Sequence, residues 1–321
     1  MDRGTLGSAE RAAFGTPGRA QFCWRSGPLR IEDIVVSALW RQSQANISLL
    51  FGELPFDRRP AAAAAAGFTA IECWWPFAGA NPSAADVDAF VTSVTDAGVQ
   101  LRGLNFFGGD MSSGERGVAA HPGRRAEFDD SVAIAVDIGA QLGVTGFNAL
   151  YGNRLDGVSD ADQDAAAVAA LVAAAEHADS IGATVLVEPI SGVAAYPLKL
   201  AVDALTVIDS VRARMTKGRI ALLADLYHLT VNGDDLDTLV AEYAEEIGHV
   251  QVADAPGRHE PGTGTAPIVD VVELLEHAGY IGRIGLEYLP AQDTVAGLGW
   301  LTQLDPTFGC SETVLPGHVT R

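Results

Sequence analysis

The chain has 321 residues, a formal net charge of -20 and a hydrophobic fraction of 48%. So acidic a balance disfavours binding to nucleic acids and anionic membranes, which are recognised through basic patches. No stretch of the sequence approaches the ~20 apolar residues of a membrane-spanning helix. The three cysteines are far apart and form no CxxC metal or redox motif. Such usage is typical of a reducing compartment, so we expect a cytoplasmic protein.

The two ends of the chain differ from its middle. Residues 1–45 begin with a stretch rich in arginine and glycine that has no apolar block, so we expect a poorly ordered extension and no secretory signal. A transit peptide, or sequence upstream of the true translation start, is the alternative. A second peripheral extension is expected over residues 301–321, where glycine and proline occur without a helical period. The remaining residues, 46–300, have the length of one α/β barrel domain of ~250 residues.

This middle part alternates short apolar runs with helical patterns, which is typical of a parallel sheet. Eight such units predict a (β/α)8 TIM barrel. An open doubly wound sheet is the alternative, but no GxGxxG follows the first strand, which also argues against a nucleotide cofactor. Strands are predicted at 46–50, 69–74, 101–106 and 145–151, and as runs that end at residues 188, 225, 251 and 287; helices are predicted at 58–66, 83–97, 125–142, 160–181, 198–215, 236–246 and 268–278.

The last four predicted strands each end in a polar residue that carries a side-chain oxygen. These residues are Glu188, Asp225, Gln251 and Glu287, and their numbers differ by 37, 26 and 36. One strand with its return helix takes ~30 residues, so the four side chains are expected on consecutive strands at one rim of the barrel. Any one of them could be a helix cap or a loop anchor. Together they predict a site for a hard divalent cation, Mg²⁺ or Mn²⁺.

The two glutamates of this set also suggest the chemistry. Removing a proton from the carbon next to a carbonyl requires a base, and returning it requires an acid. A cation that holds two substrate oxygens lowers the energy of the enediolate that forms between these steps. Glu188 and Glu287 are therefore predicted to be catalytic as well as metal-binding.

Several segments of the chain resemble the hydroxypyruvate isomerase family of xylose-isomerase-like TIM barrels. The resemblance covers roughly residues 46–290 and implies that Glu188, Asp225, Gln251 and Glu287 hold the metal while the two glutamates exchange the substrate proton. It further implies interconversion of a small α-hydroxy aldehyde and an α-hydroxy ketone, such as tartronate semialdehyde and hydroxypyruvate, and a homo-oligomer. The segments are 53–56 (ELPF), 114–117 (GERG), 187–190 (VEPI), 225–228 (DLYH) and, most specifically, 250–264 (VQVADAPGRHEPGTG).

Three further residues are predicted to bind substrate. His228 follows Asp225 by three residues, a position that contacts a substrate oxygen in similar epimerases and isomerases. Arg258 offers a guanidinium fork suited to a carboxylate or hydroxyl-rich substrate; an ion pair with Glu260 that shapes the loop is the alternative. His121, in the loop after the third strand, is the weakest of the three candidates.

Other polar and aromatic residues near the predicted rim have less specific interpretations. His249 precedes Gln251 by two residues and is expected to be a buried, hydrogen-bonded histidine. Glu72, within the second strand, is a candidate partner of a metal ligand. Four aromatic residues follow the second and third strands and would either exclude water from the enediolate or pack in the core: Trp74, Trp75, Phe106 and Phe107.

Four functional classes remain open at this point. The first is the metal-dependent isomerase, acting on a three-carbon hydroxy acid or on a four-carbon substrate such as 2-oxo-tetronate or a tetrose. The second is a polyol dehydratase, which needs an additional acid that His121 or His228 could supply. The third is a phosphodiester hydrolase, which the charge and the strand ends at Cys73 and Asn105 disfavour. A non-catalytic barrel is disfavoured because all four ligand residues are present.

Overall fold

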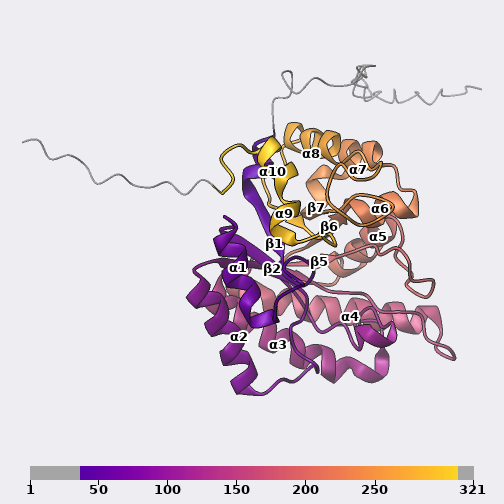
Figure 1. Ribbon diagram of the computed structural model, residues 1–321. Coiled ribbons are helices and arrows are strands. Elements are labelled where there is room, and N and C mark those ends of the chain that lie inside the picture. Colours follow the sequence, from indigo (N-terminus) through magenta and orange to yellow (C-terminus); the bar gives the residue numbers. More distant parts are fainter. Residues whose placement is uncertain (1–36, 310–321) are drawn as a thin grey trace, which may run out of the picture. The chain divides into compact units, whose positions relative to one another are not determined.

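The structure is a closed barrel of eight strands that follow one another in chain order. The computed structural model describes residues 37–309, within which each strand pairs in parallel with the next and β8 pairs with β1 (Figure 1). The predicted TIM barrel is confirmed. The strands are β1 (Ser43–Asn46), β2 (Ala70–Cys73), β3 (Gln100–Asn105), β4 (Gly146–Asn148), β5 (Thr184–Val187), β6 (Ile220–Asp225), β7 (Ile247–Val252) and β8 (Ile284–Leu286).

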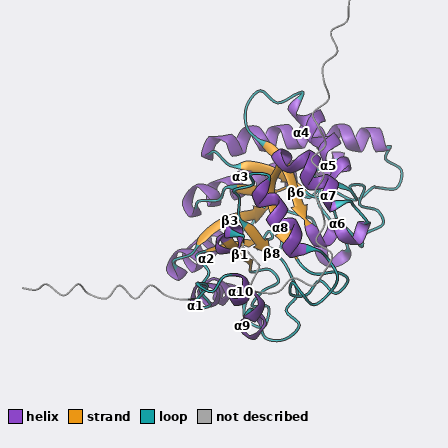
Figure 2. Ribbon diagram, turned by 90° about the horizontal axis from the view of Figure 1, so that it is seen from above, coloured by secondary structure: helices purple, strands orange, loops and turns teal. Residues whose placement is uncertain are grey.

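The helices lie outside the strands (Figure 2). Capping follows the sequence signals: the Ser83 hydroxyl accepts a hydrogen bond from the backbone N–H of Asp86, and Gly98 ends the same helix with a φ of 71°. No helix between residues 37 and 309 is long and apolar enough to cross a membrane. The helices are α1 (Arg59–Ala65), α2 (Ala84–Ala97), α3 (Arg125–Leu142), α4 (Asp160–Ala178), α5 (Ala201–Arg212), α6 (Leu226–Asn232), α7 (Leu236–Tyr243), α8 (Ile268–His277), α9 (Thr294–Gly297) and α10 (Gly299–Leu304).

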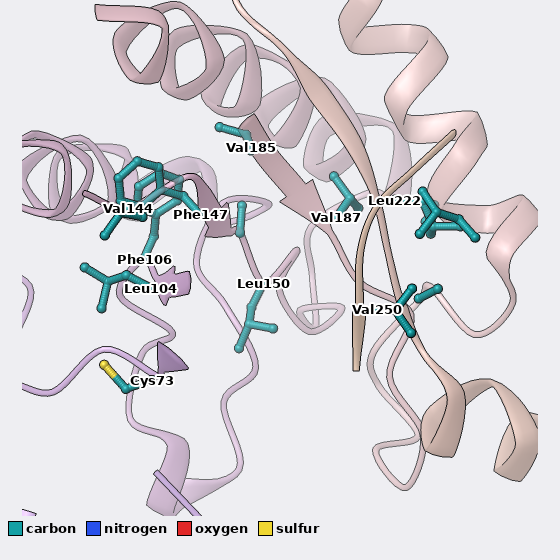
Figure 3. Packing of buried hydrophobic residues seen from close by; sticks show 14 of the residues in the cluster. Cys73, Leu104, Phe106, Val144, Phe147, Leu150, Val185, Val187, Leu222 and Val250 are labelled. Atoms are coloured by element: carbon teal, nitrogen blue, oxygen red, sulfur yellow. The ribbon is translucent and has the colours of Figure 1, made fainter. Parts of the chain in front are cut away.

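An aromatic cluster joins α3 to the third and fourth strands. Phe106, just after β3, stacks on Phe147 of β4 with ring centroids 5.1 Å apart, and the edge of Phe128 on α3 closes the group at 5.7 Å (Figure 3). Gly139 lets the helix approach, because a Cβ there would lie 2.8 Å from the Phe147 ring. This packing fixes the end of β4, where Asn148 projects toward the barrel mouth.

The first strand lies earlier than predicted. The prediction of residues 46–50 is wrong, because β1 covers Ser43–Asn46 and the apolar residues that follow form turns. The strand is polar because Gln44 and Asn46 are buried and hydrogen-bonded to Glu72. A search for apolar runs passes over such a strand. Part of the segment expected to precede the domain thus belongs to the barrel, and residues 1–36 of that expected extension lie outside the described residues.

The expected C-terminal extension is partly helical. Residues Gly299–Leu304 form α10, and Leu301 of this helix is fully buried. Phe308 then packs against Phe68 with ring centroids 4.9 Å apart. Residues up to 309 therefore contribute to the packing of the barrel, while the expectation for residues 310–321 lies outside the part of the chain that the structure describes.

A short helix that the sequence did not predict follows β6 directly. Asp225 is both the last residue of β6 and the N-cap of α6, since its Oδ1 accepts hydrogen bonds from the backbone N–H groups of Tyr227 and His228 at 2.8 and 3.2 Å. Such a cap stabilises the first turn of the helix. The same bonds fix the Asp225 carboxylate and place His228 beside it.

Candidate active site

The four predicted ligand residues lie at the carboxyl ends of neighbouring strands. Asp225 of β6 is opposite Gln251 of β7, and Glu287 follows β8 with its backbone N–H bonded to Val252 of β7 at 3.1 Å. Glu188 follows β5. All four side chains are buried. The structure therefore brings these residues to one mouth of the barrel, as the spacing predicts.

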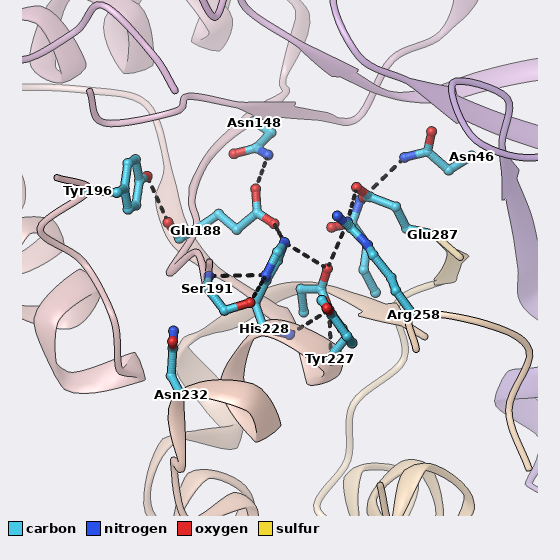
Figure 4. A network of polar contacts seen from close by, with 12 residues as sticks. Asn46, Asn148, Glu188, Ser191, Tyr196, Tyr227, His228, Asn232, Arg258 and Glu287 are labelled. Atoms are coloured by element: carbon cyan, nitrogen blue, oxygen red, sulfur yellow. Dashed lines mark hydrogen bonds and ion pairs between the residues drawn. The ribbon is translucent and has the colours of Figure 1, made fainter. Parts of the chain in front are cut away.

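Glu188 is held by one strong hydrogen bond. The side-chain amide of Asn148 donates to its Oε2 at 2.6 Å, while its Oε1 faces His228 Nε2 at 4.0 Å (Figure 4). Burial, followed by the nearby charge of Asp225, raises the pKa of Glu188 to about 8. A carboxyl group with so high a pKa can hold a proton near neutral pH and release it when positive charge arrives.

Glu287 accepts hydrogen bonds from three different elements. Arg258 and the Trp74 indole donate to its Oε1 at 2.7 and 3.1 Å, and Asn46 donates to its Oε2 at 3.1 Å. Burial raises the pKa of Glu287 well above its usual range, and the Arg258 guanidinium opposes this change. The two glutamates are thus both placed to exchange protons.

Two oxygens of the set have no hydrogen-bond partner among the residues from 37 to 309. They are Asp225 Oδ2 and Gln251 Oε1, and both are buried. Unpaired buried acceptors are costly unless another group satisfies them. A divalent cation bound to these oxygens would do so, and carboxylate and amide oxygens are ligands that Mg²⁺ and Mn²⁺ accept. The residues present therefore fit such a metal.

His228 faces the carboxylates in a fixed tautomer. Its Nδ1 accepts a hydrogen bond from the backbone N–H of Ser191 at 3.1 Å and lies 2.7 Å from the Ser191 hydroxyl. Because Nδ1 accepts, the proton of the neutral ring is on Nε2, which lies 3.8 Å from Asp225 Oδ2. Burial lowers the pKa of His228 to about 4, so the ring is neutral at pH 7.

Glu188, Asp225 and His228 offer ligand atoms within 4.8 Å of one another. These three groups alone could hold a metal ion, but the backbone bond to Nδ1 favours a different role for the histidine. An Nε2 that carries a proton donates hydrogen bonds and does not ligate. The arrangement thus favours Glu188 and Asp225 as ligands and His228 as a donor to substrate.

Arg258 reaches the rim from the loop after β7. Its Nη2 lies 2.7 Å from Glu287 and 3.7 Å from Asp225, and its guanidinium covers the Tyr227 ring at 5.2 Å. The alternative ion pair with Glu260 does not form, since the Glu260 carboxylate instead accepts from the backbone N–H of Ala291. The structure therefore places Arg258 among the site carboxylates.

The loop that carries Arg258 is organised by one buried carboxylate. Asp254 accepts hydrogen bonds from the backbone N–H groups of Ala255, Gly262 and Ala266 at 2.7 to 3.0 Å. Arg258 itself has a φ of +57°, an uncommon conformation for a residue with a side chain. These contacts direct the guanidinium toward the barrel mouth.

His121 lies in a different environment. Its Nε2 is 3.1 Å from the backbone oxygen of Asn153, which also accepts from the Gln163 side chain. The contacts recorded for His121 within residues 37–309 thus join two loops, and none of them involves the four rim residues.

Beneath the rim lies a buried polar network, most of which the sequence patterns did not predict. At its centre, Glu72 of β2 accepts hydrogen bonds from Gln251 at 2.7 Å and from Asn46 at 3.1 Å, and lies 2.7 Å from His249 Nε2. The prediction that His249 is buried and hydrogen-bonded is confirmed. Gln44 and Asn46 went unrecognised because β1 was placed too late, although buried polar residues two apart in a strand share one face.

A cavity of about 250 Å³ with several aromatic residues in its wall opens beside the rim. Trp74, Phe106 and Phe107 line it, and Trp74 also donates to Glu287. The predicted aromatic wall therefore borders the site. A larger cavity of about 410 Å³ is lined by Gln44 and His249, by three arginines and by the amino-terminal ends of several strands. It lies at the other end of the barrel from the ligand oxygens, whereas the smaller cavity adjoins them through Trp74, although the four ligand residues do not line it.

Residues 60–304 match the sequence pattern of the family described as xylose isomerase-like TIM barrel. The chain belongs to this family. It is 47% identical over 261 residues to a putative hydroxypyruvate isomerase of Streptomyces coelicolor, covering 80% of this chain and 94% of the relative. It is 35% identical over 264 residues to the 2-oxo-tetronate isomerase of Cupriavidus necator, with coverage of 80% and 96%. The resemblance noted in the sequence is confirmed, and the chain is an isomerase of this family.

A solved structure of the same fold is named AP endonuclease, family 2, from Brucella melitensis. It superposes with a TM-score of 0.73 at 31% identity and covers 81% of this chain and 98% of its own.

The raised pKa of Glu188 predicts a pH-dependent stability of the metal-free protein. Its pKa is about 8 in the folded state and near 4.5 when unfolded, so between these values only the folded state binds the proton, and stability falls as pH rises. His228 acts in the opposite direction, but only between about 4 and 6.5. From pH 6.5 to 8 we expect the free energy of unfolding to fall by up to ~1.4 kcal/mol per pH unit for each such group.

Urea unfolding of the protein in the presence of a chelator, repeated across this pH range, measures the slope of the free energy of unfolding against pH. Glu188→Gln should reduce the slope, because the amide does not titrate. Equal slopes in the wild type and this variant would contradict the assigned pKa.

Proposed function

We propose that the protein is a metal-dependent isomerase that interconverts a small α-hydroxy ketone and an α-hydroxy aldehyde, of the hydroxypyruvate and tartronate semialdehyde type. The observation that carries the proposal is the pairing of two proton-holding glutamates with two unpartnered buried oxygens at one barrel mouth. Proton transfer between adjacent carbons uses a base and an acid, and a cation that binds the free oxygens would stabilise the enediolate between the two steps. The kinship with isomerases that act on hydroxypyruvate and 2-oxo-tetronate supports the same reaction.

In this proposal Glu188, Asp225, Gln251 and Glu287 hold the metal. A bound Mg²⁺ or Mn²⁺ would supply positive charge that stabilises the enediolate oxygens. Glu188 and Glu287 follow β5 and β8, so they approach a substrate in the mouth from different sides. One glutamate, ionised, takes the proton from the substrate carbon, and the other, protonated, gives its proton to the neighbouring carbon of the cis-enediolate, while the hydroxyl proton passes from one substrate oxygen to the other.

His228 and Arg258 orient the substrate. A neutral imidazole with its proton on Nε2 donates a hydrogen bond to a substrate oxygen without adding charge. Arg258 offers a guanidinium fork beside it. Such a fork suits the carboxylate of a hydroxy acid better than the hydroxyls of an uncharged sugar.

The aromatic wall keeps water away from the intermediate. Trp74, Phe106 and Phe107 border a cavity of about 250 Å³, a volume suited to a substrate of three or four carbons. Excluding water strengthens the electrostatic interactions inside the site and protects the reactive enediolate.

A four-carbon substrate is the nearest competing proposal. The identity of 35% to a 2-oxo-tetronate isomerase supports it, and the added carbon would extend into the same cavity. A panel of three- and four-carbon hydroxy acids and sugars, followed by NMR in deuterated water, separates the two because it reports substrate and proton exchange together.

The other classes have less support from the geometry. A dehydratase needs an acid near the leaving hydroxyl, and His228 is neutral with a pKa of about 4 while His121 is bonded to Asn153. A phosphodiester hydrolase of the apurinic type needs additional metal ligands on early strands, where this chain has Cys73 and Asn105, and the net charge of -20 repels nucleic acid.

The two-glutamate mechanism predicts the effect of single amide substitutions. Glu188→Gln and Glu287→Gln should each lower kcat by at least ~100-fold, because general acid–base catalysis contributes about 10² to 10⁴, while the protein remains folded by circular dichroism. NMR in deuterated water measures exchange of the substrate α-hydrogen. Wild-type exchange in either metal-loaded variant would exclude that glutamate as a proton carrier.

Removal of divalent metal should abolish activity. The reason is that the enediolate charge and the two unpaired oxygens both require a cation. After dialysis against chelator we expect no turnover, and Mg²⁺ or Mn²⁺ should restore it, as followed by the same NMR assay. Full activity in protein shown to be metal-free by elemental analysis would contradict the proposed ligand set.

A further inference from the structure

We propose that Glu72 is a positioning residue that sets the orientation of the Gln251 side chain, so that its oxygen and not its nitrogen faces the metal site. This inference rests on the proposed metal function. It also explains why one of the four proposed ligand residues, Gln251, is a neutral glutamine.

The orientation follows from a single hydrogen bond. Gln251 Nε2 donates to Glu72 Oε1 at 2.7 Å, and Gln251 Oε1 has no hydrogen-bond partner within the described part of the chain. A carboxylate only accepts, so it must face the NH₂ end of an amide. If the amide were reversed, its oxygen would meet an anion and its NH₂ group would meet the cation. Glu72 therefore excludes the non-ligating orientation.

Glu72 is itself fixed from several directions. Asn46 donates to its Oε1, while Gln44 Nε2 and His249 Nε2 lie within hydrogen-bond distance of its Oε2. With Gln251 these make four polar contacts from two strands, β1 and β7, enough to hold a fully buried carboxylate in one rotamer. The first of them has a second function, because the same Asn46 nitrogen also donates to Glu287 at 3.1 Å.

Glycines on β3 and β8 leave room for the Glu72 carboxylate. A Cβ at Gly103 of β3 would lie 2.9 Å from the Glu72 Cβ, and one at Gly285 of β8 would lie 2.6 Å from Glu72 Oε1. Contacts this short require something to move. The two glycines thus leave space for an acidic side chain inside the barrel. A larger residue at either position would fill that space.

The presence of Glu72 also decides which residue can stand at position 251. A glutamate there would place two carboxylates within hydrogen-bond distance in a buried site, and like charges at that separation repel strongly. A glutamine keeps the oxygen ligand and supplies the donor that Glu72 needs. The negative charge on this side of the metal site is therefore carried by Glu72, which contacts the site through the Gln251 side chain.

The experiment measures Mn²⁺ affinity by electron paramagnetic resonance of the free ion. Glu72→Gln keeps the shape but accepts either orientation of Gln251, so we expect affinity to fall roughly 10- to 100-fold, the usual effect of losing a partner of a metal ligand. Glu72→Asp keeps the charge but moves it back by the length of one methylene group, so the Mn²⁺ affinity of this variant should fall similarly. The control is Glu176→Gln, the same acid-to-amide exchange at a half-buried residue of α4 whose carboxylate accepts hydrogen bonds from Thr216, and it should bind Mn²⁺ as the wild type does.

Exchanging the acid and the amide between positions 72 and 251 tests the hydrogen bond between Glu72 and Gln251 directly, without metal. Gln251→Glu alone should lower the urea midpoint of the metal-free protein, and the double variant Glu72→Gln/Gln251→Glu should recover part of the loss, because an amide again faces a carboxylate. Additive effects in this double-mutant cycle would overturn the pairing. If Gln251→Glu does not fold, the Mn²⁺ affinities of Glu72→Gln and Glu72→Asp still test the positioning role.

The outcomes separate the two proposals. Wild-type affinity in both Glu72→Gln and Glu72→Asp overturns the positioning role and leaves the metal site intact. Loss of affinity in Glu72→Gln with wild-type affinity in Glu72→Asp shows that charge matters and position does not, which also overturns it. A wild-type protein that binds no Mn²⁺ overturns the proposed function and the positioning role together.

Discussion

The burial of acidic side chains at one end of the barrel is the constraint on which the rest of the site depends. Glu188, Asp225 and Glu287 lie together where water reaches them poorly, so their charges must be neutralised by protons, by hydrogen-bond donors or by a cation. The raised pKa values of both glutamates follow from this. The same burial supports the proposed proton exchange, because it leaves both glutamates able to hold a proton above the usual carboxyl range.

The surrounding elements supply donors to one oxygen of Glu188 and one of Asp225, whereas both oxygens of Glu287 accept hydrogen bonds. Asn148 holds Glu188, the first turn of α6 holds Asp225, and Asn46 with Trp74 holds Glu287. Each donor belongs to a different strand or loop, so the closed barrel is required to bring them together. The free Oδ2 of Asp225 lies 3.7 Å from the Arg258 guanidinium and 3.8 Å from His228 Nε2, and the same imidazole nitrogen lies 4.0 Å from Glu188.

The elements predicted incorrectly share a physical cause. β1 is polar because its side chains serve Glu72 inside the barrel, and a search for apolar runs passes over it. α6 has only seven residues and begins at a residue that also ends a strand, so no separate start signal exists for it. α10 is short and its residues lack a helical period, yet burial of Leu301 against the barrel stabilises it. In each case tertiary contacts override local pattern.

The sequence by itself determined the barrel, its order of strands and the four residues at the carboxyl ends of β5 to β8, because apolar strands, helix caps and glycine stops are local signals repeated at regular spacing. Only the tertiary structure decided how those residues are held. The orientation of Gln251, the tautomer of His228 and the position of Arg258 depend on Glu72, on the Ser191 backbone and on Glu287, partners 179, 37 and 29 residues away in the chain. Contacts over such separations have no local pattern, since any donor or acceptor that the fold brings within 3 Å or so can make them.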